Sequence, residues 1–184
     1  MMTHREALEV LAQHRTDRLV VTTMTAVGIW PEISDTPLDF AYLPSAMGHG
    51  IALGLGLALA QPQRGVIVVH GDGCTLMSLG SLVTMAQHPA DLTVLIMENG
   101  LYEVTGGQTL TGAGLVDFVG LAQSAGVKRT FRFETLSEWE SGAADALSGS
   151  EPTVIVLKLE GRRGQKTPKP PRPMSEQIQR LTGD

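Results

Sequence analysis

Two polar positions that directly follow apolar runs have the residue types for metal chemistry. Asp72 stands within Gly71-Asp72-Gly73, just after the apolar run 66–69 and His70, and Asn99 follows a second apolar run, 92–97. They are 99 − 72 = 27 positions apart, a spacing that suits one βαβ crossover, and open α/β sheets bind ligands at the carboxyl ends of their strands. A hard cation such as Mg²⁺ takes carboxylate and amide oxygens together with phosphate oxygens and water. We therefore predict a diphosphate–metal site formed around Asp72 and Asn99.

The residues around Asp72 favour an anion beside the metal. Gly71 and Gly73 permit a sharp turn and a close approach of backbone N–H groups to a phosphate. A helix predicted to begin near Cys74-Thr75 would add the favourable partial charge of its amino end. Gly-Asp-Gly alone is also an ordinary turn sequence, and the second strand-end residue, Asn99, is what favours the clamp over the turn.

Two further segments are candidates to face this site. Small residues dominate 43–60, and its four central glycines would each weaken an isolated helix by about 1 kcal/mol relative to alanine; they are Gly48, Gly50, Gly54 and Gly56. We expect a tightly packed helix whose amino end, near 45–50, faces the site; a glycine-rich helix merely packed on a neighbour is the alternative. The threonines of 22–25 end a short apolar strand and could donate to a ligand, or could instead form turns and caps.

Strand and helix patterns alternate along the rest of the chain. Helices are predicted at 5–14, 115–125 and 136–147, the last capped by Ser137, and strands at 19–21, 127–133 and 153–159, with 127–133 at a sheet edge. Segment 28–44 is expected to be a long surface loop. This alternation predicts an α/β domain of three α/β/α layers around a mostly parallel sheet.

Composition sets the limits of domain organisation and partner class. The 184 residues, 42% hydrophobic and 18% charged, suit one globular domain over 1–160. A tail over 161–184, rich in proline and arginine and weakly helical at 175–181, is expected either to pack on a neighbouring subunit or to stay solvated.

The net charge of −5 argues against nucleic acid as a partner. One cysteine excludes an intrachain disulfide and a cysteine-based zinc site. With no signal-peptide pattern and no apolar stretch of about 20 residues, we expect a cytoplasmic protein without a membrane segment.

The combination of motifs resembles enzymes that use thiamine diphosphate. Gly71-Asp72-Gly73 followed by Asn99 is similar to the cofactor-binding motif of the pyruvate-decarboxylase-like superfamily. The segment SAMGH at 45–49 resembles one in sulfopyruvate and phosphonopyruvate decarboxylases, and NGLYEVTGGQ at 99–108 resembles the loop after their metal-binding asparagine. The resemblance covers roughly 5–173 and has the size of the diphosphate-binding (PP) domain alone. It implies a thiamine diphosphate-binding fold of the PP type over 1–160.

The resemblance implies a role for each matching residue. Mg²⁺ would be held by Asp72, Asn99 and the main-chain oxygen of Leu101. Met47 would lie beneath the cofactor and enforce its bent shape, while the Ser45 backbone, where the family usually has glycine, would accept a hydrogen bond from the cofactor amine. Further contacts to the cofactor would come from Thr25, Ala46, Gly71, Gly73, Cys74, Tyr102 and Val104. Thr105 would face the substrate together with His49, for which a packed or capping histidine is the alternative.

The resemblance also implies a partner. In this superfamily an activating glutamate comes from a separate pyrimidine-binding (PYR) domain, which two-chain members carry on their α subunit. The chain would then be the β subunit of an α₂β₂ or larger hetero-oligomer. Its reaction would be the non-oxidative, thiamine diphosphate- and Mg²⁺-dependent decarboxylation of a 2-oxo acid, an anionic pyruvate analogue such as 3-sulfopyruvate. The alternatives are a carboligase or acetolactate synthase-like subunit, and a cofactor-binding subunit without catalysis. A Rossmann nucleotide-binding domain is disfavoured, since no G-x-G-x-x-G follows the first strand.

Overall fold

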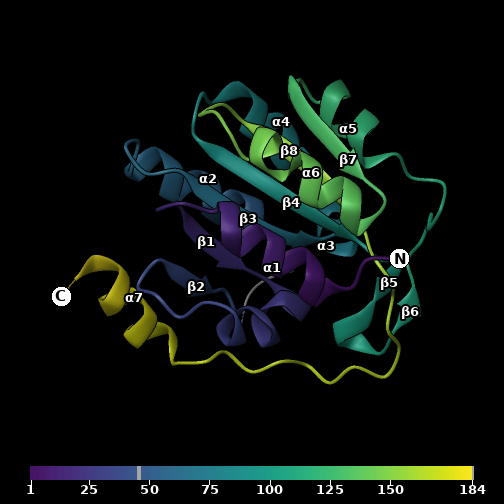
Figure 1. Cartoon of the computed structure of the whole chain (residues 1–184), viewed down its shortest axis with the longest axis horizontal. Helices are drawn as coiled ribbons and strands as arrows, with labels where there is room; N and C mark the ends of the chain where they lie inside the picture. Colours follow the sequence, from purple (N-terminus) through teal and green to yellow (C-terminus); the bar gives the residue numbers. More distant parts are fainter. Residues whose placement is uncertain (45–46, 184) are drawn as a thin grey trace.

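A parallel sheet lies between two layers of helices (Figure 1). The computed structural model describes residues 1–44 and 47–183. The strands of the sheet, in the spatial order β2-β1-β3-β4-β8-β7, are β1 (Leu19–Thr22), β2 (Asp39–Ala41), β3 (Val66–Gly71), β4 (Leu92–Glu98), β7 (Arg129–Phe133) and β8 (Thr153–Lys158). All five strand pairs are parallel. The predicted three-layer α/β fold is confirmed, with β7 at an edge as expected.

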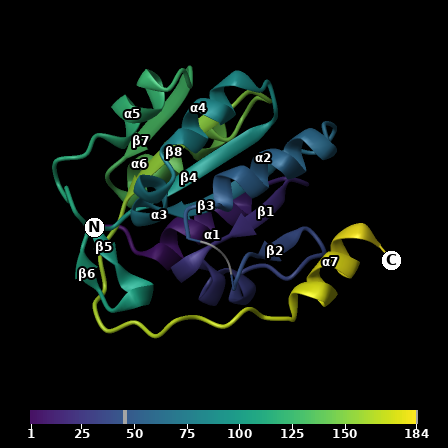
Figure 2. The same cartoon turned by 180° about the vertical axis from the view of Figure 1, so that it is seen from behind.

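Helices cover both faces of the sheet, as the views from the front and from behind show (Figures 1 and 2). The α-helices are α1 (His4–His14), α2 (Gly50–Ala60), α3 (Asp72–Met77), α4 (Gly80–Gln87), α5 (Phe118–Ser124), α6 (Leu136–Ala146) and α7 (Met174–Thr182). Short 3₁₀ turns follow β1 (η1, Met24–Gly28; η2, Trp30–Glu32) and β5 (η3, Glu103–Thr105). After β4 the chain forms a second, two-stranded antiparallel sheet from β5 (Leu101–Tyr102) and β6 (Gln108–Thr109).

The alternation of side chains along each strand builds two hydrophobic cores. On β3, Val68 packs into the core that contains α2, α4 and α5, whereas its neighbour Ile67 packs into the core that contains α1 and α6. Successive strand residues point to opposite faces, so a sheet covered on both sides requires apolar residues at every position. This requirement explains the unbroken apolar runs of β3 and β4, both of which are buried along their length.

Several predicted boundaries are corrected. Helix α2 begins at Gly50, at the end of the predicted range 45–50, whereas α5 begins at Phe118 and not at 115, which leaves Leu115 in an exposed loop. Segment 28–44 contains the edge strand β2, which at three residues is too short to show a periodic pattern. The cap of α6 is Thr135, not Ser137: its hydroxyl accepts from the Glu138 amide while the Glu138 carboxylate accepts from the Thr135 amide, a capping box.

The tail packs against its own chain. Its irregular part passes the β5–β6 hairpin, and α7 lies beside β2 at the sheet edge (Figures 1 and 2). There the Gln177 side chain accepts from the Ala41 amide at 2.7 Å and donates to the Ala41 carbonyl at 3.3 Å, so α7 continues the hydrogen-bonding edge of the sheet. A contact of the tail with a second subunit stays a prediction.

No helix within residues 1–44 and 47–183 has the length and apolarity that a membrane span requires.

Candidate functional site

The main cleft opens at the carboxyl ends of β1, β3 and β4. Its empty volume is about 530 Å³ with its open mouth included. The β3 and β4 ends lie side by side because Gly71 pairs with Met97 in the parallel register. The structure therefore brings Asp72, at the start of α3, next to Asn99, the first residue after β4. The walls come from η1, the β3–α3 turn and the loop after β4, lined by Thr23, Met24, Thr25, Gly71, Asp72, Gly73, Cys74, Asn99, Leu101, Tyr102, Glu103, Val104 and Thr105.

Asp72 joins the two turns through its carboxylate. Oδ1 accepts from the Gly73 amide at 2.7 Å, and Oδ2 accepts from the amides of Asn99 at 3.0 Å and Gly100 at 2.7 Å. Only 1% of the residue is exposed, and this burial raises the pKa of the carboxyl to about 6 despite the three N–H donors. A carboxylate has about four lone-pair positions, so three amide bonds leave capacity on Oδ1 for a cation.

Oxygen donors dominate the possible metal site. Among the residues that the structure describes, no group of three or more His, Cys, Asp and Glu side chains could hold a metal ion. The remaining donor set is the Asp72 carboxylate, the Asn99 amide and a main-chain carbonyl, which suits Mg²⁺ better than a softer metal. In this structure the Asn99 side-chain oxygen accepts from the Leu101 amide at 2.9 Å, so it is held against the main chain of the residue whose carbonyl is the third expected ligand.

Gly73 is required for packing and not for a sharp turn, because it is the second residue of α3. A Cβ at this position would lie 2.5 Å from the Tyr102 ring, a separation that no real side chain could adopt. No atom lies within 4 Å of the corresponding position at Gly71. Next to Gly73, the thiol of Cys74 is buried, and burial raises its pKa. Tyr102 of β5 and Gly73 of α3 thus pack closely against each other in the cleft wall.

The remaining candidate residues divide into three groups. Val104, Thr105 and Thr25 line the cleft. Met47 also lines it and is 44% exposed at the rim, next to the half-exposed Met77. His49 is exposed and is not among the cleft-lining residues; its Nδ1 lies 3.3 Å from the Met47 carbonyl. Ser45 and Ala46 lie outside the described residues.

Three titratable residues of the cleft wall, His4, His70 and Glu103, were not predicted from the sequence. Glu103 is 3% exposed and accepts from the Thr25 hydroxyl. His4, the first residue of α1, places its Nε2 3.5 Å from the Asn99 amide nitrogen, and burial lowers the His4 pKa. His70 is buried, and within residues 1–44 and 47–183 its Nε2 has no hydrogen-bond partner; burial lowers the His70 pKa to about 4. Neither composition nor periodicity indicates burial of charged residues at a loop or a helix start.

Comparison with known families identifies the family of the chain. Residues 23–157 match the family described as thiamine pyrophosphate enzyme, C-terminal TPP binding domain. The chain belongs to this family. The resemblance found in the sequence and the predicted thiamine diphosphate-binding domain are therefore confirmed at the family level.

Individual relatives agree with the family. The chain is 42% identical to a phosphonopyruvate decarboxylase of Streptomyces hygroscopicus over 120 residues, which are 64% of this chain and 29% of that protein. It is 38% identical to the sulfopyruvate decarboxylase subunit beta of Methanothermobacter thermautotrophicus over 132 residues, 68% of each chain. The chain spans less than a third of the phosphonopyruvate decarboxylases that it matches.

Solved structures show the same architecture. An enzyme from Mycobacterium smegmatis, described as thiamin diphosphate-dependent, matches 88% of this chain and 32% of its own with a TM-score of 0.74 and 27% identity. Benzoylformate decarboxylase from Polynucleobacter necessarius matches 92% of this chain and 34% of its own with a TM-score of 0.75; at 21% identity this second match concerns the fold alone.

Proposed function

We propose that this chain is the β subunit of a two-chain, thiamine diphosphate- and Mg²⁺-dependent 2-oxo acid decarboxylase. The observation that carries the proposal is the cleft in which one buried carboxylate, Asp72, joins the ends of β3 and β4, in a chain of the TPP-binding family. The reaction is the non-oxidative decarboxylation of an anionic pyruvate analogue such as 3-sulfopyruvate.

Different cleft residues bind the metal and the different parts of the cofactor. Asp72, Asn99 and the Leu101 carbonyl hold Mg²⁺, and the Gly73 and Cys74 segment contacts the diphosphate. Other cofactor contacts come from Thr25, Ser45, Ala46, Met47, Gly71, Tyr102 and Val104. When bound, thiamine diphosphate supplies the nucleophilic carbon and the electron sink for the loss of carbon dioxide. The protein binds and orients the reactants and limits the access of water, with Thr105 nearest to the substrate.

The rim of the cleft supports the involvement of a partner chain. Met47 and Met77 are 44% and 50% exposed, although apolar side chains at a cofactor cleft are ordinarily covered when the site is complete. Subunits named beta among the relatives, of which this chain covers 66% to 84%, also support a second chain. A PYR-domain α subunit that covers the rim and supplies the activating glutamate accounts for both observations.

The proposal is tested by reconstitution with the chain encoded beside this one. Carbon dioxide release from 3-sulfopyruvate, with thiamine diphosphate and Mg²⁺ present, is expected only when both chains are mixed, because the activating glutamate is on the partner. Phosphonopyruvate and pyruvate are the comparison substrates, and Asp72→Ala in the mixture is the inactive control. Robust turnover by this chain alone would overturn the split-subunit assignment. A carbon–carbon bond-forming product would instead indicate a carboligase.

A further inference from the structure

The buried carboxylate of Glu103 connects segments that are far apart in the chain. Its Oε2 accepts from the Thr25 hydroxyl at 2.9 Å, and its Oε1 accepts from the main-chain N–H of Arg162 at 2.8 Å. The Nε2 atom of His4 lies 3.6 Å from Oε2. One side chain in the cleft wall thus contacts η1, the start of α1 and the start of the tail. Donors that lose such an acceptor inside the fold are left without a hydrogen-bond partner, which destabilises the arrangement.

The tail residues that follow run along the whole cofactor loop, residues 99–109; we call residues 161–173 the strap. The Arg163 guanidinium donates to the Gly107 carbonyl and, at 3.1 Å, to the Thr109 hydroxyl. The Thr167 hydroxyl donates to the Val104 carbonyl at 3.2 Å. Gly161 lies so close that an added Cβ would be 2.8 Å from the Asn99 carbonyl oxygen. The strap therefore contacts the loop near both of its ends and in its middle.

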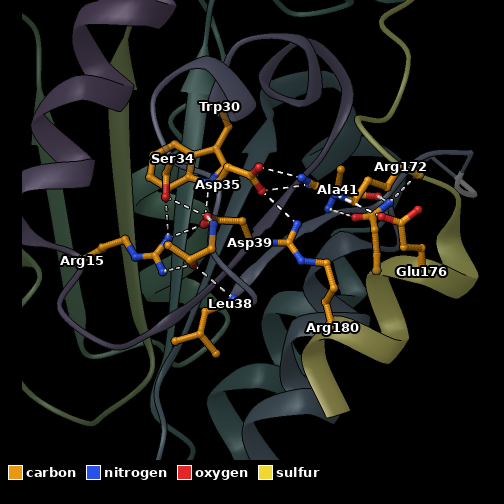
Figure 3. Close-up of polar contacts among 12 residues, drawn as sticks. Arg15, Trp30, Ser34, Asp35, Leu38, Asp39, Ala41, Arg172, Glu176 and Arg180 are labelled. Carbon is orange, nitrogen blue, oxygen red and sulfur yellow. Dashed lines mark hydrogen bonds and ion pairs between the residues drawn. The ribbon is translucent and has the colours of Figure 1, made fainter. Parts of the chain in front are cut away.

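The other end of the strap is held near β2, the edge strand of the sheet, by ion pairs to Asp35 (Figure 3). Arg172 donates twice to the Asp35 carboxylate, at 2.8 and 2.6 Å, and Arg180 of α7 donates to it at 2.9 Å. The hydrogen bonds from Arg172 and then Arg180 hold the pKa of Asp35 down at about 2. Since both ends are held, the strap has little freedom to leave the cofactor loop.

The cofactor loop needs such support because of its own sequence. Gly100, Gly106 and Gly107 have φ angles of +71°, +124° and +73°, and glycine loses more conformational freedom on folding than any other residue. Contacts from outside the loop must offset this loss.

We propose that Glu103 is a positioning residue: by joining Thr25 to the strap, it holds the cofactor loop in the conformation that presents Asn99 and the Leu101 carbonyl to the metal. This role deepens the proposed function and rests on it. In this role Glu103 binds neither the metal nor the substrate itself. It acts like the outer groups that orient metal ligands.

The test combines amide hydrogen exchange of the ligand-free chain with cofactor affinity of the assembled two-chain complex. Glu103→Met removes both acceptors at similar side-chain length. Exchange in 99–109 should accelerate, and affinity for thiamine diphosphate with Mg²⁺ should fall by about ten- to a hundred-fold, while kcat at saturating cofactor changes far less. Glu103→Gln should restore most of both properties, because its amide oxygen still accepts from Arg162 and the Thr25 hydroxyl can rotate to accept. Glu140→Gln, on the exposed face of α6, is the matched control.

A second pair of variants keeps the test decisive if Glu103→Met does not fold. Arg163→Ala removes two hydrogen bonds between the strap and the loop and should accelerate exchange in 106–109, whereas Lys166→Ala removes an exposed charge and should match the wild type. Unchanged exchange in 99–109 of Glu103→Met overturns the proposal, and where Glu103→Met does not fold, unchanged exchange in 106–109 of Arg163→Ala overturns it. Acceleration of equal size in β3 and β8 also overturns it, since it would show a general loss of stability. If the wild type does not bind thiamine diphosphate, the proposed function fails, and the exchange data alone decide whether Glu103 positions the loop.

Discussion

At the scale of single residues, Asp72 combines a structural and a chemical role. Its carboxylate accepts hydrogen bonds from three backbone amides. These bonds fix the segments after β3 and β4 relative to each other without any metal. Its position is therefore set before a cation arrives, and preorganised ligands lower the cost of binding. Burial raises the pKa of the Asp72 carboxyl to about 6, so an arriving divalent cation also relieves an unfavourable buried charge.

This pKa predicts the pH dependence of metal binding. Below about pH 6 the Asp72 carboxyl is protonated, and Mg²⁺ must displace the proton, so Mg²⁺-dependent cofactor affinity should fall by up to about tenfold per pH unit. Above that pH the affinity should level off. Calorimetry of the assembled complex between pH 5 and pH 8, values chosen to span the pKa at about 6, measures this directly. Asp72→Ala should abolish Mg²⁺-dependent binding, and the exposed Asp17→Ala should not change it. Wild-type affinity in Asp72→Ala would refute the metal assignment.

At the scale of elements, the glycines of α2 have two different environments. A Cβ at Gly54 would lie 2.2 Å from Val68 on β3, whereas no atom lies within 4 Å of the same position at Gly56. Gly54 is thus the close approach between helix and sheet that the sequence predicts for this segment. Gly56 faces outward and has no packing role. At Gly54 the low helix propensity of glycine is offset by the close contact with β3. Packing does not explain the glycine at position 56.

The two positions form a matched pair for a stability experiment. Gly54→Ala should lower the free energy of unfolding by about 1–3 kcal/mol, because the added methyl overpacks the interface with Val68. Gly56→Ala should raise it by up to about 1 kcal/mol through higher helix propensity. Urea denaturation of both variants measures the two values. Equal effects of the same sign would show that propensity, and not the contact with β3, decides the glycine at 54.

At the scale of the whole molecule, the chain closes on itself through its tail. The strap runs from the cofactor loop to α7, which lies at the β2 edge (Figures 1 and 3). Asp35 is the acceptor that joins Arg172 and Arg180 there. The tail thereby covers an edge strand, whose unpaired backbone groups would otherwise be free to pair with another chain.

The low pKa of Asp35 predicts when this closure is lost. A carboxyl with a pKa of about 2 when α7 is docked, against 3.8 otherwise, stabilises docking above about pH 4 and loses that effect as the pH falls toward 2. Asp35→Asn should give the same release at neutral pH. Proteolysis within 161–173 and amide exchange in α7 are expected to accelerate in this variant, while Asp17→Asn is unchanged. Undisturbed protection of α7 in Asp35→Asn would show that the Gln177 bonds to Ala41 are sufficient.

The sequence by itself determined the architecture and the centre of the cleft, because both follow from local rules. Periods of two and 3.6 mark strands and helices, and parallel strands must bring their carboxyl ends together, which is why Asp72 and Asn99 meet. Only the tertiary structure decided the surroundings. Glu103 and His4 are buried, Gly73 fits Tyr102, and the strap crosses the cofactor loop, while His49 stays outside the cleft. Each of these features depends on packing between segments that are distant in the chain. No local pattern of residue types specifies which distant side chain will lie against a given position.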